Sequence, residues 1–164
     1  MASGRDDALL TKERGVDDKY DKLGPQWNAV GVELARVTGN GGESALLYAE
    51  IGEGWVSPNI YIPDGDVVRF HLPDNDDFTA LLFQAWYLEE VNKRWSTVEY
   101  RIEKGRFSAA FGFPDEVDVR DIEGADERRD AVVRRYFGDK RVVYPPLGPE
   151  AQELTLNRDG RSAR

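Results

Sequence analysis

The fold class that we expect is decided by residues 97–113, TVEYRIEKGRFSAAFGF. On both sides of Lys104-Gly105 an apolar side chain recurs at every second position, namely at Val98, Tyr100, Ile102, Phe107, Ala109, Phe111 and Phe113. A period of two is typical of half-buried β-strands, and a short break that contains glycine is typical of a hairpin turn. The segment therefore predicts two antiparallel strands, Thr97–Glu103 and Arg106–Phe113.

Earlier segments show the same alternation of apolar and polar residues. From this alternation we expect four more strands, at Trp27–Val37, Ser44–Glu53, Trp55–Ile62 and Val67–Leu72. We expect tight turns at the breaks between them, Gly39–Gly42, Gly52–Gly54 and Pro63–Asp66.

The clearest helical pattern lies between the two groups of strands. Apolar side chains from Phe78 to Val91 form a wide stripe at a spacing of three and four residues, as in a helix that covers a sheet. Asp74 or Asn75 can cap its first turn, and we expect the helix to end near Asn92–Arg94.

Two further helical segments flank the strands. Residues 1–23 have a weak apolar stripe that Gly24-Pro25 should end, and Asp126–Phe137 has a stronger one that is followed by Gly138. Hairpins that are grouped, and do not alternate with helices, predict an α+β fold: a mostly antiparallel sheet of about six strands with helices packed on it, in a single domain. The expected parts of the chain are an N-terminal helical segment (1–24), the α+β domain (25–146) and a flexible C-terminal tail (147–164).

The chain is acidic, with 22 Lys and Arg against 31 Asp and Glu and a formal net charge of −9. Such a field repels the phosphates of nucleic acids and anionic membranes, so we expect neither as a partner. It attracts a cationic protein surface and raises the rate of association with it. Solubility alone also accounts for an acidic composition. The arginines of residues 128–141 alternate with acids, which is typical of a solvated, salt-bridged helix.

The 164 residues include no cysteine, which excludes disulfides, thiolate catalysis and cysteine-ligated metals. Residues 1–24 lack the apolar run of a secretory signal, and no apolar stretch approaches the length of about 18 residues that a membrane span needs. We therefore expect a cytoplasmic protein.

Residues with catalytic or metal-binding chemistry are few. His71 is the only histidine, and no Gly-x-Ser-x-Gly motif accompanies it. The acidic run 74–77 does not fit the EF-hand pattern, because Thr79 and Ala85 stand where that pattern needs glycine and glutamate. We expect no metal, no cofactor and no enzymatic activity, although the 31 acidic residues leave a catalytic carboxylate pair open.

Carboxylates gather in two places. Eight lie between Pro114 and Asp130, and five more flank the helix expected from Phe78 onward. If both groups share one face, they form a negative patch beside Trp86 and Tyr87, and a rigid aromatic among carboxylates suits a cationic protein surface. The residues that we expect to bind a partner are Asp76, Asp77, Trp86, Tyr87, Glu89, Glu90, Asp115, Glu116, Asp118, Asp121, Glu123, Asp126 and Glu127. The alternative is that Trp86 belongs to the core and the carboxylates serve solubility.

Aromatic and glycine landmarks follow one another in a set order. They are Trp27 at the start of the first expected strand, Trp86 and Trp95 around the central helix, the run Gly105–Phe113 with Asp115 after it, and Arg135–Gly138 before Tyr144-Pro145. In this order, over about residues 8–146, the chain resembles the YezG-like immunity proteins of bacterial polymorphic toxin systems. It departs from them at Phe113-Pro114, where the family often carries a tyrosine.

The resemblance implies a function without catalysis. Such immunity proteins are not enzymes, and they occlude a cognate toxin that is often a nuclease and sometimes an NAD-degrading enzyme. For this chain the resemblance implies a one-to-one complex with a toxin domain, whose active site an acidic and aromatic surface would cover.

Two other functions stay open. A small hydrolase would hold a carboxylate pair in a deep pocket near His71. A secretion-associated chaperone or structural subunit would present a long apolar groove in place of a charged patch.

Overall fold

The computed structural model describes residues 23–39, 43–73 and 77–146. They form a sheet of six strands in the order β5-β4-β1-β2-β3-β6, and each neighbouring pair is antiparallel except β3 and β6. This is the expected α+β class, with helices packed on a mostly antiparallel sheet in a single domain. The strands are β1 (Ser44–Gly52), β2 (Trp55–Asp64), β3 (Val67–His71), β4 (Thr97–Glu103), β5 (Arg106–Gly112) and β6 (Arg141–Val143).

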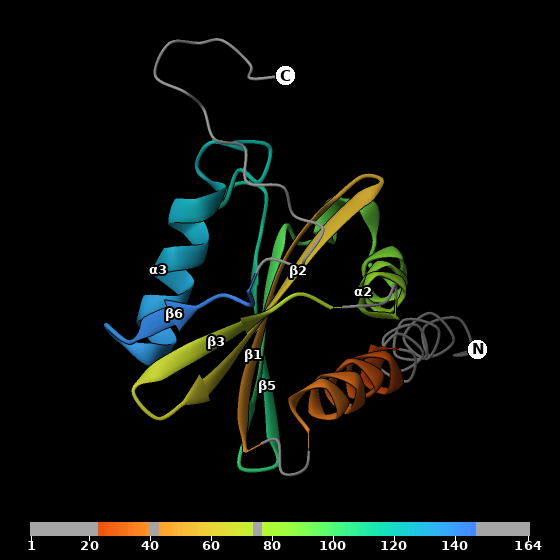
Figure 1. Cartoon of the computed structure of the whole chain (residues 1–164). Helices are drawn as coiled ribbons and strands as arrows, with labels where there is room; N and C mark the ends of the chain where they lie inside the picture. Colours follow the sequence, from red (N-terminus) through yellow and green to blue (C-terminus); the bar gives the residue numbers. More distant parts are fainter. Residues whose placement is uncertain (1–22, 40–42, 74–76, 147–164) are drawn as a thin grey trace, which may run out of the picture.

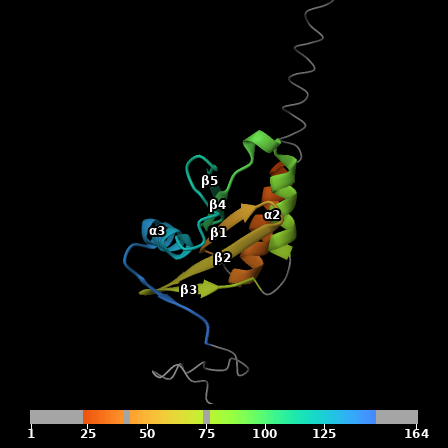
Figure 2. The same cartoon turned by 90° about the horizontal axis from the view of Figure 1, so that it is seen from above.

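Helices lie on both faces of the sheet (Figure 1, Figure 2). The first helix, of which residues 23–38 are described, and α2 (Asp77–Leu88) cover one face, which we call the helix-pair face. The other face is covered by α3 (Ala125–Phe137), and we call it the α3 face. α2 ends at Leu88 and a separate 3₁₀ turn, η1 (Val91–Lys93), lies between it and β4, so the predicted end of the helix near Asn92–Arg94 is wrong. No helix within the described residues has the length and apolar character that a membrane crossing needs.

Six elements have nearly the bounds that the sequence predicts, namely β1, β2, β3, β4, β5 and α3. In the β4–β5 hairpin, Lys104 and Gly105 have φ angles of 49° and 74°. Two consecutive positive φ angles are typical of the type I′ turn, whose twist matches that of the strands it joins. At the end of α3, Gly138 has a φ of 66°, and its N–H donates to the carbonyl oxygen of Arg134 at 2.8 Å. Glycine adopts this left-handed conformation without the steric cost of a Cβ atom.

One prediction is wrong, because residues 27–37 belong to the first helix and form no strand. Helical spacing buries Val30 and Leu34 on the helix-pair face, with Trp27 packed against the same core. A strand would point Val32 in the same direction as Val30 and Leu34, yet Val32 is 60% exposed. The segment fits both a period of two and a period of 3.6, and packing on the sheet selects the helix.

This correction changes the N-terminal part of the fold. Gly24-Pro25 lies inside the first helix and does not end it, so the expected boundary between residues 24 and 25 falls within one element. The sixth strand is β6, which the sequence did not predict and which pairs in parallel with β3. Several expectations fall outside the described residues, namely those for residues 1–22, 40–42, 74–76 and 147–164.

The two faces bury different residues. The core on the helix-pair face includes the fully buried side chains Val30, Leu34, Leu47, Ile51, Ile60, Phe78, Leu82 and Val98. The core on the α3 face is smaller and includes two tyrosines, with members Leu46, Tyr48, Tyr61, Val68, Val132 and Val133. Glu50 and Asn59 are buried as well. Both belong to the α3 face, because they alternate along β1 and β2 with side chains of the other core.

Candidate functional site

The most acidic part of the chain follows β5 directly. Residues 113–127 comprise the connection to α3 and its first turn, and they carry seven carboxylates and a single arginine, Arg120. We call residues 113–127 the acidic segment. It begins at one end of the sheet, because Gly112 pairs with Thr97, and Thr97 pairs with Glu50 near the end of β1.

Backbone hydrogen bonds close the start of the acidic segment. The carbonyl oxygen of Phe113 accepts the backbone N–H groups of Glu116 and Val117, each at 2.9 Å. The Glu116 carboxylate accepts the N–H of Phe113 at 3.2 Å. A Cβ atom on Gly112 would overlap the hydroxyl of Thr97, so glycine lets the chain lie close against β4. The direction of the chain after β5 is therefore fixed by its own local contacts.

Two aspartates hold the middle of the acidic segment. Oδ1 of Asp118 accepts the backbone N–H of Arg120 at 3.1 Å and its Nε–H at 3.2 Å. These bonds favour the charged carboxylate, and they hold the pKa of Asp118 below its usual range, with the backbone bond from Arg120 as the largest cause. Oδ1 of Asp121 accepts the N–H of Gly124 at 3.2 Å.

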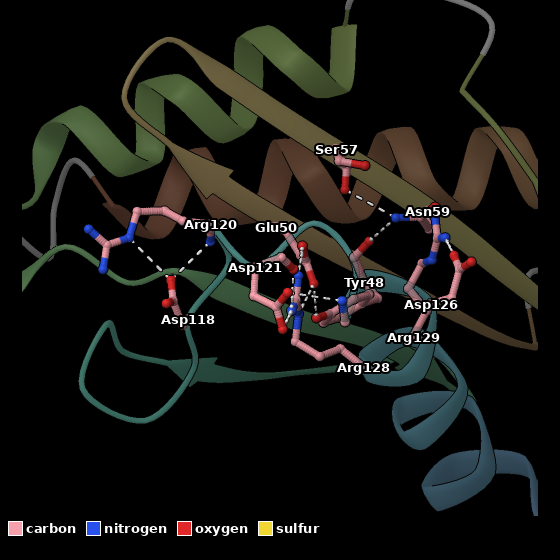
Figure 3. Close-up of polar contacts among 11 residues, drawn as sticks. Tyr48, Glu50, Ser57, Asn59, Asp118, Arg120, Asp121, Asp126, Arg128 and Arg129 are labelled. Carbon is pink, nitrogen blue, oxygen red and sulfur yellow. Dashed lines mark hydrogen bonds and ion pairs between the residues drawn. The ribbon is translucent and has the colours of Figure 1, made fainter.

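A buried ion pair joins the acidic segment to the sheet (Figure 3). Arg128 of α3 donates from Nε and Nη2 to the two carboxylate oxygens of Glu50 on β1, at 2.7 and 3.0 Å. Its Nη1 donates to the backbone carbonyl of Asp121 at 2.8 Å. The hydrogen bonds to Glu50 are the largest cause of a raised pKa of Arg128. One guanidinium therefore holds together a strand, a helix and the acidic segment.

Tyr48 completes this buried polar group. Its hydroxyl donates to Oε1 of Glu50 at 2.8 Å. Burial first, and the Glu50 carboxylate second, raise the pKa of Tyr48 above its ordinary value, so the phenol remains a neutral donor. Removing one partner of such a buried pair typically costs about 3–5 kcal/mol, because it leaves the other charge without compensation.

Four of the predicted partner-binding carboxylates make contacts inside the protein. Glu116, Asp118 and Asp121 bind backbone groups of the acidic segment, as described above. Asp126 forms an ion pair with Arg129 on the next turn of α3. These four residues shape the surface, and part of their charge is already engaged there.

Three carboxylates and two apolar side chains of the segment are open to a partner. Asp115, Glu123 and Glu127 are exposed, and none of their side chains has a hydrogen bond or ion pair with any residue that the structure describes. Ile122 is 83% exposed, and Phe113 is also exposed. Sequence analysis did not select these two residues, although a large apolar side chain inside an acidic run was a usable signal. A large apolar side chain exposed among charged residues can serve as an anchor when a partner covers it.

Trp86 does not belong to the surface on which the sequence placed it. It is 6% exposed and packs in the core of the helix-pair face. Its indole N–H donates to the carbonyl oxygen of Trp95 at 2.9 Å, which satisfies its only donor. Its neighbour Tyr87 is exposed, with the Arg94 guanidinium 5.0 Å from the centre of its ring. A spacing of four residues from Phe78 through Leu82 already placed Trp86 on the buried side of the helix, and Tyr87 outside it.

The acids around α2 lie at the ends of a helix that covers the face of the sheet opposite α3 (Figure 2). Asp77 opens α2, whereas Glu89 and Glu90 follow its last residue. Glu90 also forms an ion pair with Lys93 at 2.8 Å. Asp76 lies outside the described residues. The predicted residues thus come from two regions of the chain, and the acidic segment contributes the larger number.

The described surface also holds cavities. A groove of about 560 Å³ separates the first helix from β5, and Trp27, Tyr100, Phe107 and Phe111 are among its lining residues. It is the feature closest to the apolar groove that a chaperone would present. Two smaller cavities, of about 490 and 170 Å³, lie beside α2 and α3, and His71 lines none of the three. No three His, Asp or Glu side chains of residues 23–39, 43–73 and 77–146 gather closely enough to hold a metal ion.

Comparisons with known proteins place the chain in no family. No model of a protein family matches it, and no curated protein matches its sequence.

Proposed function

We propose that this chain is an inhibitor of the immunity-protein type, which binds one toxin domain through the acidic segment and covers its active site. The observation that carries the proposal is the construction of this segment. Its charge is concentrated, and its backbone is held by Phe113, Asp118 and the Glu50–Arg128 pair.

The charge of the acidic segment supports a cationic partner. An enzyme that acts on nucleic acid or on a dinucleotide uses basic groups to bind phosphates. A surface with seven carboxylates and one arginine attracts the same basic groups, and the net charge of −9 adds to the attraction. Toxins of the nuclease or NAD-degrading kind present this chemistry.

The local rigidity of the acidic segment supports tight binding. Ordering a loop on association costs about 0.5–1.5 kcal/mol for each immobilised side chain, and a loop that is already ordered avoids much of this cost. Ile122 and Phe113 then supply apolar contact, while Asp115, Glu123 and Glu127 supply charge.

The first experiment identifies the partner. The tagged full-length chain is expressed in its native host, and bound proteins are identified by mass spectrometry. We expect one basic toxin domain in one-to-one stoichiometry, and co-expression of this chain should suppress the growth defect that the domain causes. Recovery of many clients would instead favour a chaperone, and recovery of none would contradict the proposal.

The second experiment tests the acidic segment with matched charge. One variant replaces its three open carboxylates, Asp115, Glu123 and Glu127, by alanine. The control removes the same charge from exposed carboxylates of the segments that meet at the opposite end of the sheet, Glu43, Asp66 and Asp139. We expect the first variant to associate with the toxin domain roughly tenfold or more slowly, with a weaker salt dependence, and the control to keep most of the wild-type rate. Equal rates for the two variants would remove the acidic segment from the proposal.

A further inference from the structure

Among the residues that the structure describes, β5 forms a free edge of the sheet. β5 pairs with β4 on one side, and no described strand pairs with its other side. Six of its seven residues are exposed, and the strand contains no proline and only one charge, Arg106. Natural proteins usually protect an exposed edge with charges, proline or a covering loop, because its unpaired backbone groups can accept another strand. An unprotected edge of this length therefore indicates a docking site for a strand.

The turn geometry shows which backbone groups of β5 face outward. In a two-residue type I′ hairpin the flanking residues, here Glu103 and Arg106, form a hydrogen-bonded pair. Hydrogen-bonded and non-hydrogen-bonded pairs alternate along an antiparallel ladder. The N–H and C=O groups of Phe107, Ala109 and Phe111 therefore point away from β4, toward the free edge.

The sequence of β5 is nearly symmetric about Ala109. It has phenylalanine two residues before and two residues after Ala109, at Phe107 and Phe111, and the small residues Ser108 and Ala110 between them. An antiparallel copy of the same strand, related by a two-fold axis at Ala109, would place Phe107 opposite Phe111 of the second copy. Aromatic pairs directly opposite each other stabilise antiparallel strands. All the outward N–H and C=O groups would be paired in this register.

Side-chain burial and charge favour the same register. Phe107 is 49% exposed beside the groove under the first helix, and pairing would cover it with an aromatic ring. Arg106 would lie opposite Gly112 of the second copy, next to the start of that copy's acidic segment. The single charge of each strand, Arg106, thus lies opposite an uncharged residue, so this register places no like charges opposite each other.

We propose that two copies of this chain pair through β5 in antiparallel register centred on Ala109, so that their two sheets become one. The occupant of the free edge is a second copy, because the strand is complementary to itself in its backbone and its aromatic side chains, and its one charge meets no like charge. The free edge of β5 differs from the surface assigned to the toxin, which lies after β5 and on the α3 face. The pairing of two copies can therefore be tested separately from the binding of a toxin.

In the proposed register, residue 109 of one copy would lie directly opposite residue 109 of the second copy, and the test uses this symmetry. The mass of the full-length chain is measured by sedimentation at increasing concentration for the wild type, for Ala109→Lys and for Ala109→Glu. We expect a wild-type dimer that either variant alone weakens by roughly tenfold or more, because like charges stand opposite each other. A mixture of the two variants should form heterodimers at wild-type concentrations, since Lys then faces Glu.

Ser108→Lys serves as the control, because its new charge would face Ala110 of the second copy and not itself. We expect it to dimerise nearly as the wild type does. A wild-type chain that stays monomeric at every concentration would overturn the proposal, and so would a Lys and Glu mixture no more dimeric than either variant alone. A monomeric chain whose edge binds an extended segment of another protein would overturn it too.

Hydrogen exchange gives a second measurement that needs no variant. The amides of Phe107, Ala109 and Phe111 should become protected as concentration rises, whereas those of Ser108 and Ala110 already donate to β4 and should change little. Protection that is independent of concentration at all five amides would contradict pairing of two copies.

Discussion

The helix-pair face and the α3 face of the sheet hold their helices by different contacts. On the helix-pair face, Phe78 and Leu82 of α2 are fully buried in an apolar core. On the α3 face, Val132 and Val133 pack beside the ion pair of Glu50 and Arg128. Apolar burial is non-directional, whereas a bidentate ion pair fixes both distance and orientation.

A second polar contact extends this difference along α3. The hydroxyl of Tyr136 donates to Oε2 of Glu99 at 2.6 Å, and Arg135 forms an ion pair with the same carboxylate. α3 is thus held near its first turn by Arg128 and near its last turn by Tyr136. We conclude that charged contacts fix α3 in position, whereas the helices of the helix-pair face are held by apolar burial and by neutral hydrogen bonds, such as the one from the Tyr100 hydroxyl to the carbonyl oxygen of Trp27.

The largest expected effect tests the apolar face. Phe78→Ala should lower the free energy of unfolding by about 4 kcal/mol, because it removes a fully buried ring and leaves a cavity. Chemical denaturation measures the loss. A cost below about 1 kcal/mol would mean that this core is not the main source of stability.

The next effect tests the polar face. Arg128→Ala should cost about 3 kcal/mol, because Glu50 stays buried without its partner. The double variant Glu50→Leu with Arg128→Met should cost less than this single change, since no buried charge remains. In both proteins, hydrogen exchange should be faster in the acidic segment, because Asp121 loses the donor to its carbonyl. If the double variant lowers the free energy of unfolding as much as Arg128→Ala does, the ion pair stabilises the fold in addition to orienting α3.

Alkaline pH compares buried phenols on the two faces. Burial raises the pKa of Tyr61 on the α3 face, and of Tyr100 on the helix-pair face, to about 12. Folding then favours the protonated phenol, so this stability is present below pH 10 and is lost as the pH rises from about 10 to about 12. Between pH 9 and pH 11.5, the free energy of unfolding of Tyr61→Phe should therefore fall by about 2 kcal/mol less than that of the wild type. Unfolding free energies at pH 9 and pH 11.5 measure it, and an unchanged pH dependence would contradict burial as the cause.

The smallest effect is local to the acidic segment. Asp118→Asn should leave the free energy of unfolding unchanged within error, because Asp118 is exposed, while the amide of Arg120 should exchange faster. The depressed pKa of Asp118 implies that the wild type also loses this protection on acidification, as the pH falls through the pKa of the folded state. An Arg120 amide that exchanges at one rate in both proteins would show that other contacts hold the turn.

The sequence by itself determined the elements whose information is local. The β4–β5 hairpin follows from a period of two around Lys104-Gly105, and α3 follows from its apolar stripe and Gly138. Turns and amphipathic faces depend on residues that are neighbours in the chain, so a single sequence contains what is needed to predict them.

Only the tertiary structure decided the rest, because burial and strand pairing join residues that are distant in the chain. Residues 27–37 fit a strand as well as a helix until the sheet buries Val30 and Leu34. β6 has three residues and no hairpin, so nothing near it in the sequence indicates its parallel partner. Arg128 has the spacing of a solvated helix, and yet it forms a part-buried ion pair with Glu50, 78 positions away. The sequence therefore shows that residues 113–127 are acidic, whereas the fold decides which of their carboxylates remain available to a partner.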